Sequence, residues 1–189
     1  MRQIKLSAML VALMLAATAA IAADTFTIDP AHSSATFSVR HMMISTVPGR
    51  FSGISGTINY DDKDITKSSV EATIKTATIS TDNDYRDKDL KSANYFDVEK
   101  YPDITFKSTK VEKRGDQLVA IGDFTMHGVT KQIELPFDIN KVTTPRGDVI
   151  GATAELKLSR KDYGITSGAA AVGDEVKIAL SVEAHPAKK

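Results

Sequence analysis

The sequence predicts an all-β protein built as an antiparallel β-barrel, on three observations. From residue 23 onward the chain has 14 Ile, 12 Val and 18 Thr but only 6 Leu, and β-branched side chains favour strands over helices. Apolar and polar residues alternate with a period of two in several segments, which is typical of strands with one buried face. Turn-forming residues separate these segments at spacings of roughly a dozen residues, as in a sandwich or a barrel. Long, numerous strands favour the barrel, because closure leaves no exposed edge.

The predicted strands follow one another with turns between them. The clearest alternation is found in residues 133–139, 150–158 and 176–182. Further strands are expected at residues 25–29, 34–41, 50–60, 69–80, 103–113 and 117–127. Gly and Asp mark the turns, as in Arg114-Gly115-Asp116. The expected fold is an eight-stranded antiparallel β-barrel.

Two segments interrupt this pattern. Residues 82–93 are charged and lack β-branched side chains, and Thr81 or Asp82 can cap a helix. We predict a short helical excursion over residues 82–93 that covers or plugs one end of the barrel. Residues 161–174 are rich in Gly and Ala and predict a mobile loop at a rim of the barrel.

The first 22 residues differ from the rest of the chain. Arg2 and Lys5 precede an uncharged apolar run over residues 8–17, and Ala20-Ile21-Ala22 resembles a cleavage site. This order predicts a cleaved secretory signal peptide over residues 1–22, because the apolar run is too short to span a bilayer. An uncleaved membrane anchor is the alternative. Residues 23–189 then form a single domain, periplasmic in a Gram-negative source and secreted otherwise, with no stable membrane anchor after cleavage.

Composition excludes several classes of function. The chain has 24 basic and 24 acidic side chains and no Cys, which argues against nucleic-acid binding and excludes thiol chemistry. The four His show no metal-binding spacing, and His185 lies in a tail expected to be disordered. His127 precedes Gly128 and is expected to be a turn residue. We therefore predict no catalytic residues, no metal site and no cofactor.

The faces predicted to point inward suggest a ligand site. Large apolar residues alternate there with small ones such as Ala35, Ala72, Ala120 and Ala154, which leaves apolar volume unless neighbours collapse into it. A packed core without a cavity remains the alternative. The candidate ligand-binding residues are Phe37, Val39, His41, Ile58, Ile74, Phe106, Phe124, Leu135, Phe137, Leu156, Ile178 and Leu180. The candidates at the mouth, on the helical segment, are Arg86, Asp87, Leu90 and Phe96.

Specific words in the chain resemble the YceI-like family of bacterial periplasmic and secreted proteins. These words span residues 32–176 in order, from His32-Ser33 to Gly173-Asp174-Glu175-Val176, and include Phe37-Ser38-Val39-Arg40-His41, Tyr95-Phe96-Asp97, Gly122-Asp123-Phe124-Thr125-Met126-His127-Gly128 and Arg160 with Asp162-Tyr163-Gly164-Ile165. The resemblance implies an extended, lipocalin-like barrel that binds a polyisoprenoid or an isoprenoid quinone and has no established enzymatic activity. The chain departs from the family pattern at Asp89, Lys91 and Tyr95, where His, Arg and Phe are common.

The sequence is compatible with three functions. The leading hypothesis is a periplasmic carrier that holds a long isoprenoid lipid, with a role in lipid transport, storage or stress response. The second is a protein-interaction module with a packed core and no ligand. The third, a hydrolase or isomerase using His41, Arg40 or the Arg86-Asp87 pair, ranks last because no nucleophile–base arrangement is visible. A homodimer is compatible with the sequence.

Overall fold

The computed structural model describes residues 23–188 of the chain, so the predicted signal peptide lies outside the described residues. Ten strands form one sheet in the order β1-β4-β5-β6-β7-β8-β9-β10-β2-β3. Every pairing is antiparallel. The strands are β1 (Asp24–Ile28), β2 (Ser34–His41), β3 (Ser45–Phe51), β4 (Ile54–Tyr60), β5 (Ser69–Lys75), β6 (Asp103–Arg114), β7 (Gln117–Met126), β8 (Val129–Thr144), β9 (Gly147–Ser159) and β10 (Val172–Pro186).

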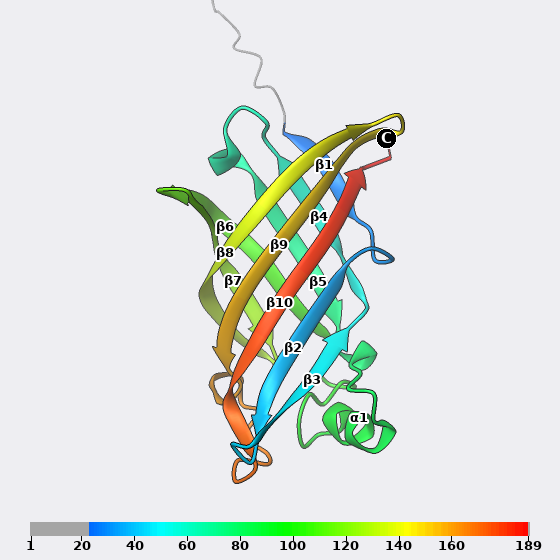
Figure 1. Cartoon of the computed structure of the whole chain (residues 1–189), viewed down its shortest axis with the longest axis vertical. Coiled ribbons are helices and arrows are strands. Elements are labelled where there is room, and N and C mark those ends of the chain that lie inside the picture. The colour runs from blue at the N-terminus through cyan, green and yellow to red at the C-terminus, as the bar shows by residue number, and fades with distance from the viewer. Residues whose placement is uncertain (1–22, 189) are drawn as a thin grey trace, which may run out of the picture.

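The sheet closes on itself because β1 also pairs with β10, opposite Phe26 and Pro186. The closed ring contains β1, β4, β5, β6, β7, β8, β9 and β10, which confirms the predicted eight-stranded barrel. β2 and β3 continue the wall beyond β1 and β4 (Figure 1). An isolated bridge between Arg50 and Ser80 joins β3 to the segment after β5. The long strands give the barrel its extended shape.

The barrel has two ends, which the connections define. The helix α1 (Asp84–Lys91) lies between β5 and β6, beside β3 in Figure 1. We refer to this as the α1 end. Because neighbouring strands are antiparallel, the β7–β8 turn and the β9–β10 loop also lie at the α1 end. The β4–β5 connection, with the short 3-10 helix η1 (Ile65–Lys67), lies at the opposite end. Two more 3-10 helices, η2 (Thr76–Thr78) and η3 (Lys161–Tyr163), belong to the α1 end.

Several sequence expectations need correction. The predicted strand 50–60 is two strands, interrupted at Ser52 and Gly53, and the first of them begins at Ser45. Pro48 concealed β3, because proline ordinarily breaks a strand, yet it is tolerated at an edge. The predicted strand 69–80 ends at Lys75, since Thr76 turns away to donate its backbone N–H to the Pro102 carbonyl at 2.9 Å and its hydroxyl to the Tyr101 carbonyl at 2.8 Å.

The ends of two other elements also differ from the prediction. Helix α1 is capped by Asn83, whose side chain accepts the Arg86 N–H, and not by Thr81 or Asp82. Asp82 has a left-handed backbone (φ 56°) and forms an ion pair with Arg50. His185 does not lie in a disordered tail, because β10 continues to Pro186 and pairs His185 with Thr27. None of the helices within residues 23–188 is long and apolar enough to cross a membrane.

Candidate functional site

The barrel encloses a cavity of about 270 Å³ whose lining is almost entirely apolar. Ile65 of η1 lines it at one end, and Leu90 of α1 lines it at the other. The cavity therefore runs along much of the barrel and is elongated. Its volume lies near the lower limit of the roughly 300–1,000 Å³ typical of ligand pockets.

Most of the predicted site residues line this cavity. Its wall includes Phe37, Val39, Ile58, Ile74, Phe106, Phe124, Leu135, Phe137, Leu156, Ile178 and Leu180, together with Leu90 and Phe96 at the α1 end. They share the inward face of their strands, as the period-two alternation predicted. Their contact with a ligand stays a prediction.

Three predicted site residues lie elsewhere. His41 is half-buried at the end of β2, opposite Ser45 and Val172, and does not belong to the cavity wall. The alternation that brings Phe37 and Val39 into the cavity wall does not extend to His41. Arg86 and Asp87 also lie outside the cavity wall, because both side chains hydrogen-bond to Thr81.

An aromatic row forms the wall near α1. The Phe37 ring lies over Gly49 of β3, so that a Cβ at Gly49 would come within 2.2 Å of the ring. The rings of Phe37 and Phe51 are 5.6 Å apart, and Phe51 meets Phe96 edge-on at the same separation. Gly49 thus lets β2, β3 and the segment after α1 share one aromatic surface.

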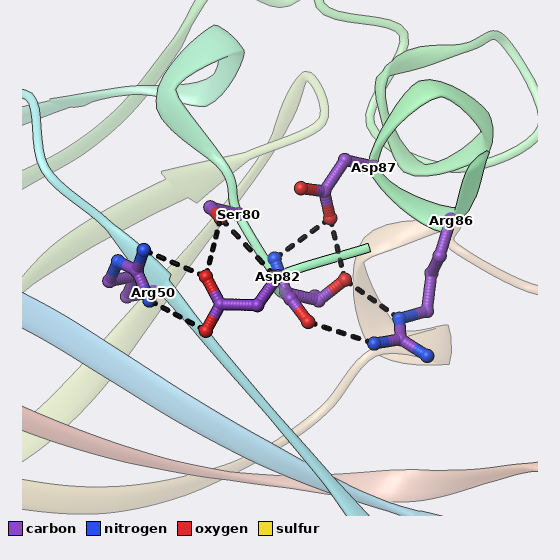
Figure 2. A network of polar contacts seen from close by, with 6 residues as sticks. Arg50, Ser80, Asp82, Arg86 and Asp87 are labelled. Carbon is purple, nitrogen blue, oxygen red and sulfur yellow. Dashed lines mark hydrogen bonds and ion pairs between the residues drawn. The ribbon is translucent and has the colours of Figure 1, made fainter. Parts of the chain in front are cut away.

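Polar contacts fix α1 to this wall (Figure 2). The Arg50 guanidinium donates to both oxygens of Asp82, at 3.0 and 2.9 Å, and holds the pKa of that carboxyl below its usual value. On the other side of the network, Asp87 accepts the Thr81 N–H at 2.8 Å, and Arg86 donates to the Thr81 carbonyl at 2.9 Å. The helix is therefore attached to the barrel through the segment that precedes it.

The candidate site residues predicted from the sequence do not include the two titratable residues of the cavity wall, Tyr95 and Arg160, which lie at its α1 end. Arg160 is 5% exposed, and its guanidinium donates only to backbone carbonyls. Its four acceptors are Ile165 at 2.8 Å, Ser167 at 2.7 Å, Gly173 at 2.9 Å and Val172 at 3.0 Å. The β9–β10 loop, which the sequence predicts to be mobile, is therefore held in place by the buried Arg160 guanidinium. A lone Arg after a strand gives no sequence signal for this role.

Asp174 fastens the same loop from outside. Its carboxylate accepts the Lys161 N–H at 3.1 Å and the Ser159 hydroxyl at 2.9 Å. These contacts, the backbone N–H foremost, hold the pKa of Asp174 below its usual value. Because the β9–β10 loop lies at the α1 end of the cavity, the Asp174 carboxylate helps to hold that end of the site in place.

Acid should weaken the loop through Asp174. The pKa of Asp174 is lower in the folded state than the value of about 3.9 expected in the unfolded chain. The ionised carboxylate therefore stabilises the fold fully above about pH 3.9, and this stabilisation is lost as the pH falls through the pKa of the folded state. We expect Asp174→Asn to melt at a lower temperature than the parent protein at neutral pH, with the difference shrinking below about pH 4. Thermal unfolding followed by circular dichroism measures this. A difference that is constant with pH would contradict the role of the charge.

His127 occupies the turn predicted for it. Its backbone is left-handed (φ 52°), and Nδ1 lies 3.0 Å from the Tyr163 carbonyl. Its ring meets Tyr101 edge-on at 4.5 Å. These contacts join the β7–β8 turn to the β9–β10 loop and give His127 a structural role.

A closed, extended antiparallel barrel around an apolar cavity defines the class of lipocalin-like β-barrels. Comparison with known proteins makes the assignment more specific. The YceI-like domain matches residues 26–184, and the chain belongs to the YceI-like family. Protein YceI of Escherichia coli O6:H1 (strain CFT073) is 37% identical over 175 residues, which cover 90% of this chain and 91% of that relative.

Solved structures show the same fold. BcnA of Burkholderia cenocepacia superposes with a TM-score of 0.74 at 20% identity, covering 84% of this chain and 99% of BcnA. A domain from Saccharophagus degradans, described as a polyisoprenoid binding domain, superposes with a TM-score of 0.68 at 14% identity, covering 86% of this chain and 98% of that domain. At these identities the likeness concerns the fold.

Proposed function

We propose that this protein binds the chain of an isoprenoid lipid, a polyisoprenoid or an isoprenoid quinone, inside the barrel. The elongated apolar cavity is the observation that carries the proposal. Apolar surface removed from water contributes roughly 25 cal/mol per Å², or about 0.8 kcal/mol per CH₂. A long hydrocarbon chain can therefore be held without a polar anchor.

The likeness in fold to the Saccharophagus degradans domain supports the choice of an isoprenoid. The titratable side chains in the cavity wall are Tyr95 and Arg160, and Arg160 is engaged by carbonyls. The function proposed is accordingly binding and carrying, with no catalysis and no cofactor in the cavity. A packed barrel that serves only as a protein-interaction module accounts less well for this volume.

The wider role follows from the N-terminal sequence. We propose that residues 1–22 direct export and are removed, so that the barrel carries its lipid in the periplasm. Transport, storage and protection during stress are the roles open to such a carrier.

Lipid extraction and uptake test the proposal. Protein purified from its native source is extracted with organic solvent, and the extract is analysed by mass spectrometry. Stripped protein is then offered a short-chain and a long-chain isoprenoid quinone, with bound quinone measured after gel filtration. We expect a prenyl lipid in the extract and uptake of the quinone. Empty extracts together with no uptake would overturn the proposal.

A pair of matched variants locates the binding site. Ala154 points into the cavity from β9, whereas Ala179 of the neighbouring β10 is half-buried and does not belong to the cavity wall. Ala154→Phe should weaken quinone uptake by about tenfold or more, because the ring would displace at least about two CH₂ groups of the ligand, at about 0.8 kcal/mol each, and about 1.4 kcal/mol of lost binding is tenfold. Ala179→Phe should leave uptake unchanged. Equal affinities of the two variants, both with parental melting temperatures, would place the ligand outside the barrel.

A further inference from the structure

Side chains that can ligate a metal ion lie together outside the barrel cavity, where β1 joins β10. Ligand atoms of Asp29, His32 and Glu183 all lie within 4.8 Å of one another, and His185 adjoins two of these residues. Asp29 and His32 lie just after β1, and Glu183 and His185 lie on β10. His32 Nδ1 is 2.7 Å from Asp29 Oδ2. His185 Nε2 is 3.6 Å from the same oxygen and 3.1 Å from Glu183 Oε1. We call these four residues the Asp29 cluster.

The backbone holds the Asp29 cluster in place. The Asp29 N–H donates to the Glu183 carbonyl at 2.8 Å. The buried Ser33 hydroxyl accepts the Glu183 N–H at 3.1 Å, and His185 pairs with Thr27 in the ladder of β1 and β10. The two halves of the cluster are therefore fixed relative to one another before any ion arrives, which lowers the entropic cost of binding.

The donor set and its spacing suit one class of ion. Zinc bound tetrahedrally at about 2.0–2.2 Å places its ligand atoms roughly 3.3 Å apart. The contacts of Asp29 with His32, Asp29 with His185 and Glu183 with His185 bracket this value, and ligand atoms of His32 and Glu183 lie within 4.8 Å of each other. Two carboxylates balance the charge of a divalent cation, and neutral imidazole is a preferred zinc ligand. Calcium and magnesium prefer oxygen ligands alone, so the two imidazoles disfavour them.

We propose that the Asp29 cluster binds Zn²⁺ and clips the β1–β2 connection to the last strand of the barrel. The side chains remain accessible for entry of the ion, with His32 exposed over 64% and His185 over 47% of their side-chain surface. Sequence reasoning missed the cluster because Asp29 and Glu183 lie far apart in the chain. Its local signals are the three-residue spacing of Asp29 and His32 and the two-residue spacing of Glu183 and His185, which places the latter two on one face of a strand.

Zinc competition with a chromogenic chelator tests the proposal. The purified protein is stripped with a chelator, and Zn²⁺, Ca²⁺ and Mg²⁺ are offered in separate titrations. We expect about one zinc ion per chain and no response to calcium or magnesium. The double variant His32→Ala, His185→Ala should lose zinc binding by about tenfold or more, whereas His41→Ala should retain it.

Melting temperatures and zinc binding of the parent protein and its variants distinguish the possible outcomes. Circular dichroism first establishes that each variant is folded. Zinc should raise the melting temperature of the parent protein and of His41→Ala but not of the double variant. Undiminished zinc binding by the folded double variant would overturn the proposal, as would the absence of zinc binding by the parent protein. Quinone uptake by the stripped protein tests the barrel independently.

Discussion

Arg160→Met should be strongly destabilising, lowering the free energy of unfolding by about 4 kcal/mol. Methionine keeps much of the volume of the arginine stem but removes every donor. The carbonyls of Ile165, Ser167, Val172 and Gly173 would then lose their partner in a buried setting. Hydrogen bonds to a charged group contribute about 1.5–3 kcal/mol each, and they are not fully additive.

Urea unfolding measures the effect of Arg160→Met, and Arg146→Met is the matched control. Arg146 lies exposed in the β8–β9 turn, so its substitution should change stability by no more than about 0.5 kcal/mol. Arg160→Lys should fall between, because lysine keeps the charge but lacks the planar fork that reaches several carbonyls. Equal stabilities of Arg160→Met and Arg146→Met would show that the buried cation does not hold the loop.

Gly56→Ala is the second large effect, with an expected loss of about 3 kcal/mol. Gly56 lies in β4 with φ of +146°, a conformation that side chains rarely adopt. A Cβ there would lie 2.1 Å from the Glu71 carbonyl oxygen of the paired strand β5. Because the obstacle is backbone, the two strands would have to separate locally.

Gly151→Ala provides the control for Gly56→Ala. Gly151 is an exposed position in β9, and nothing lies within 4 Å of an added Cβ. Its substitution should be neutral or stabilise by about 0.4–1 kcal/mol, through the unfolded chain. The unfolding midpoints of the two variants in urea should therefore move in opposite directions or differ widely. Coinciding midpoints would refute the steric argument.

The barrel wall could be predicted from the sequence because strand parity is a local property. Within residues 133–139, 150–158 and 176–182 of β8, β9 and β10 the large aliphatic and aromatic side chains all fall on alternate positions, and Leu135, Leu156 and Ile178 line the cavity as expected. Element ends were less predictable, because partners distant in sequence decide them. β5 ends before Thr76 because Thr76 hydrogen-bonds to residues 101 and 102. β10 continues to residue 186 because it pairs there with β1.

The polar parts of the site were least predictable. Arg160 binds backbone carbonyls, which carry no sequence signature. Arg86 and Asp87 hydrogen-bond to Thr81 and do not line the cavity. The Asp29 cluster requires both ends of the described chain. In each case the sequence supplies the chemical groups, but only the closed fold determines which of them meet.

The pairing of β1 with β10 also determines the order in which the molecule can form. Phe26 and Pro186 face one another across the closing seam although the whole domain separates them in sequence. Contacts between residues so far apart in the sequence cost a large amount of chain entropy before the contact itself stabilises the fold. Barrels with such topology therefore fold slowly. The ring closes only after β10 has been synthesised. Until then β1 can pair with β4 but not with β10. A nascent chain that has not yet added β10 therefore has unpaired edges on β1, β2 and β9.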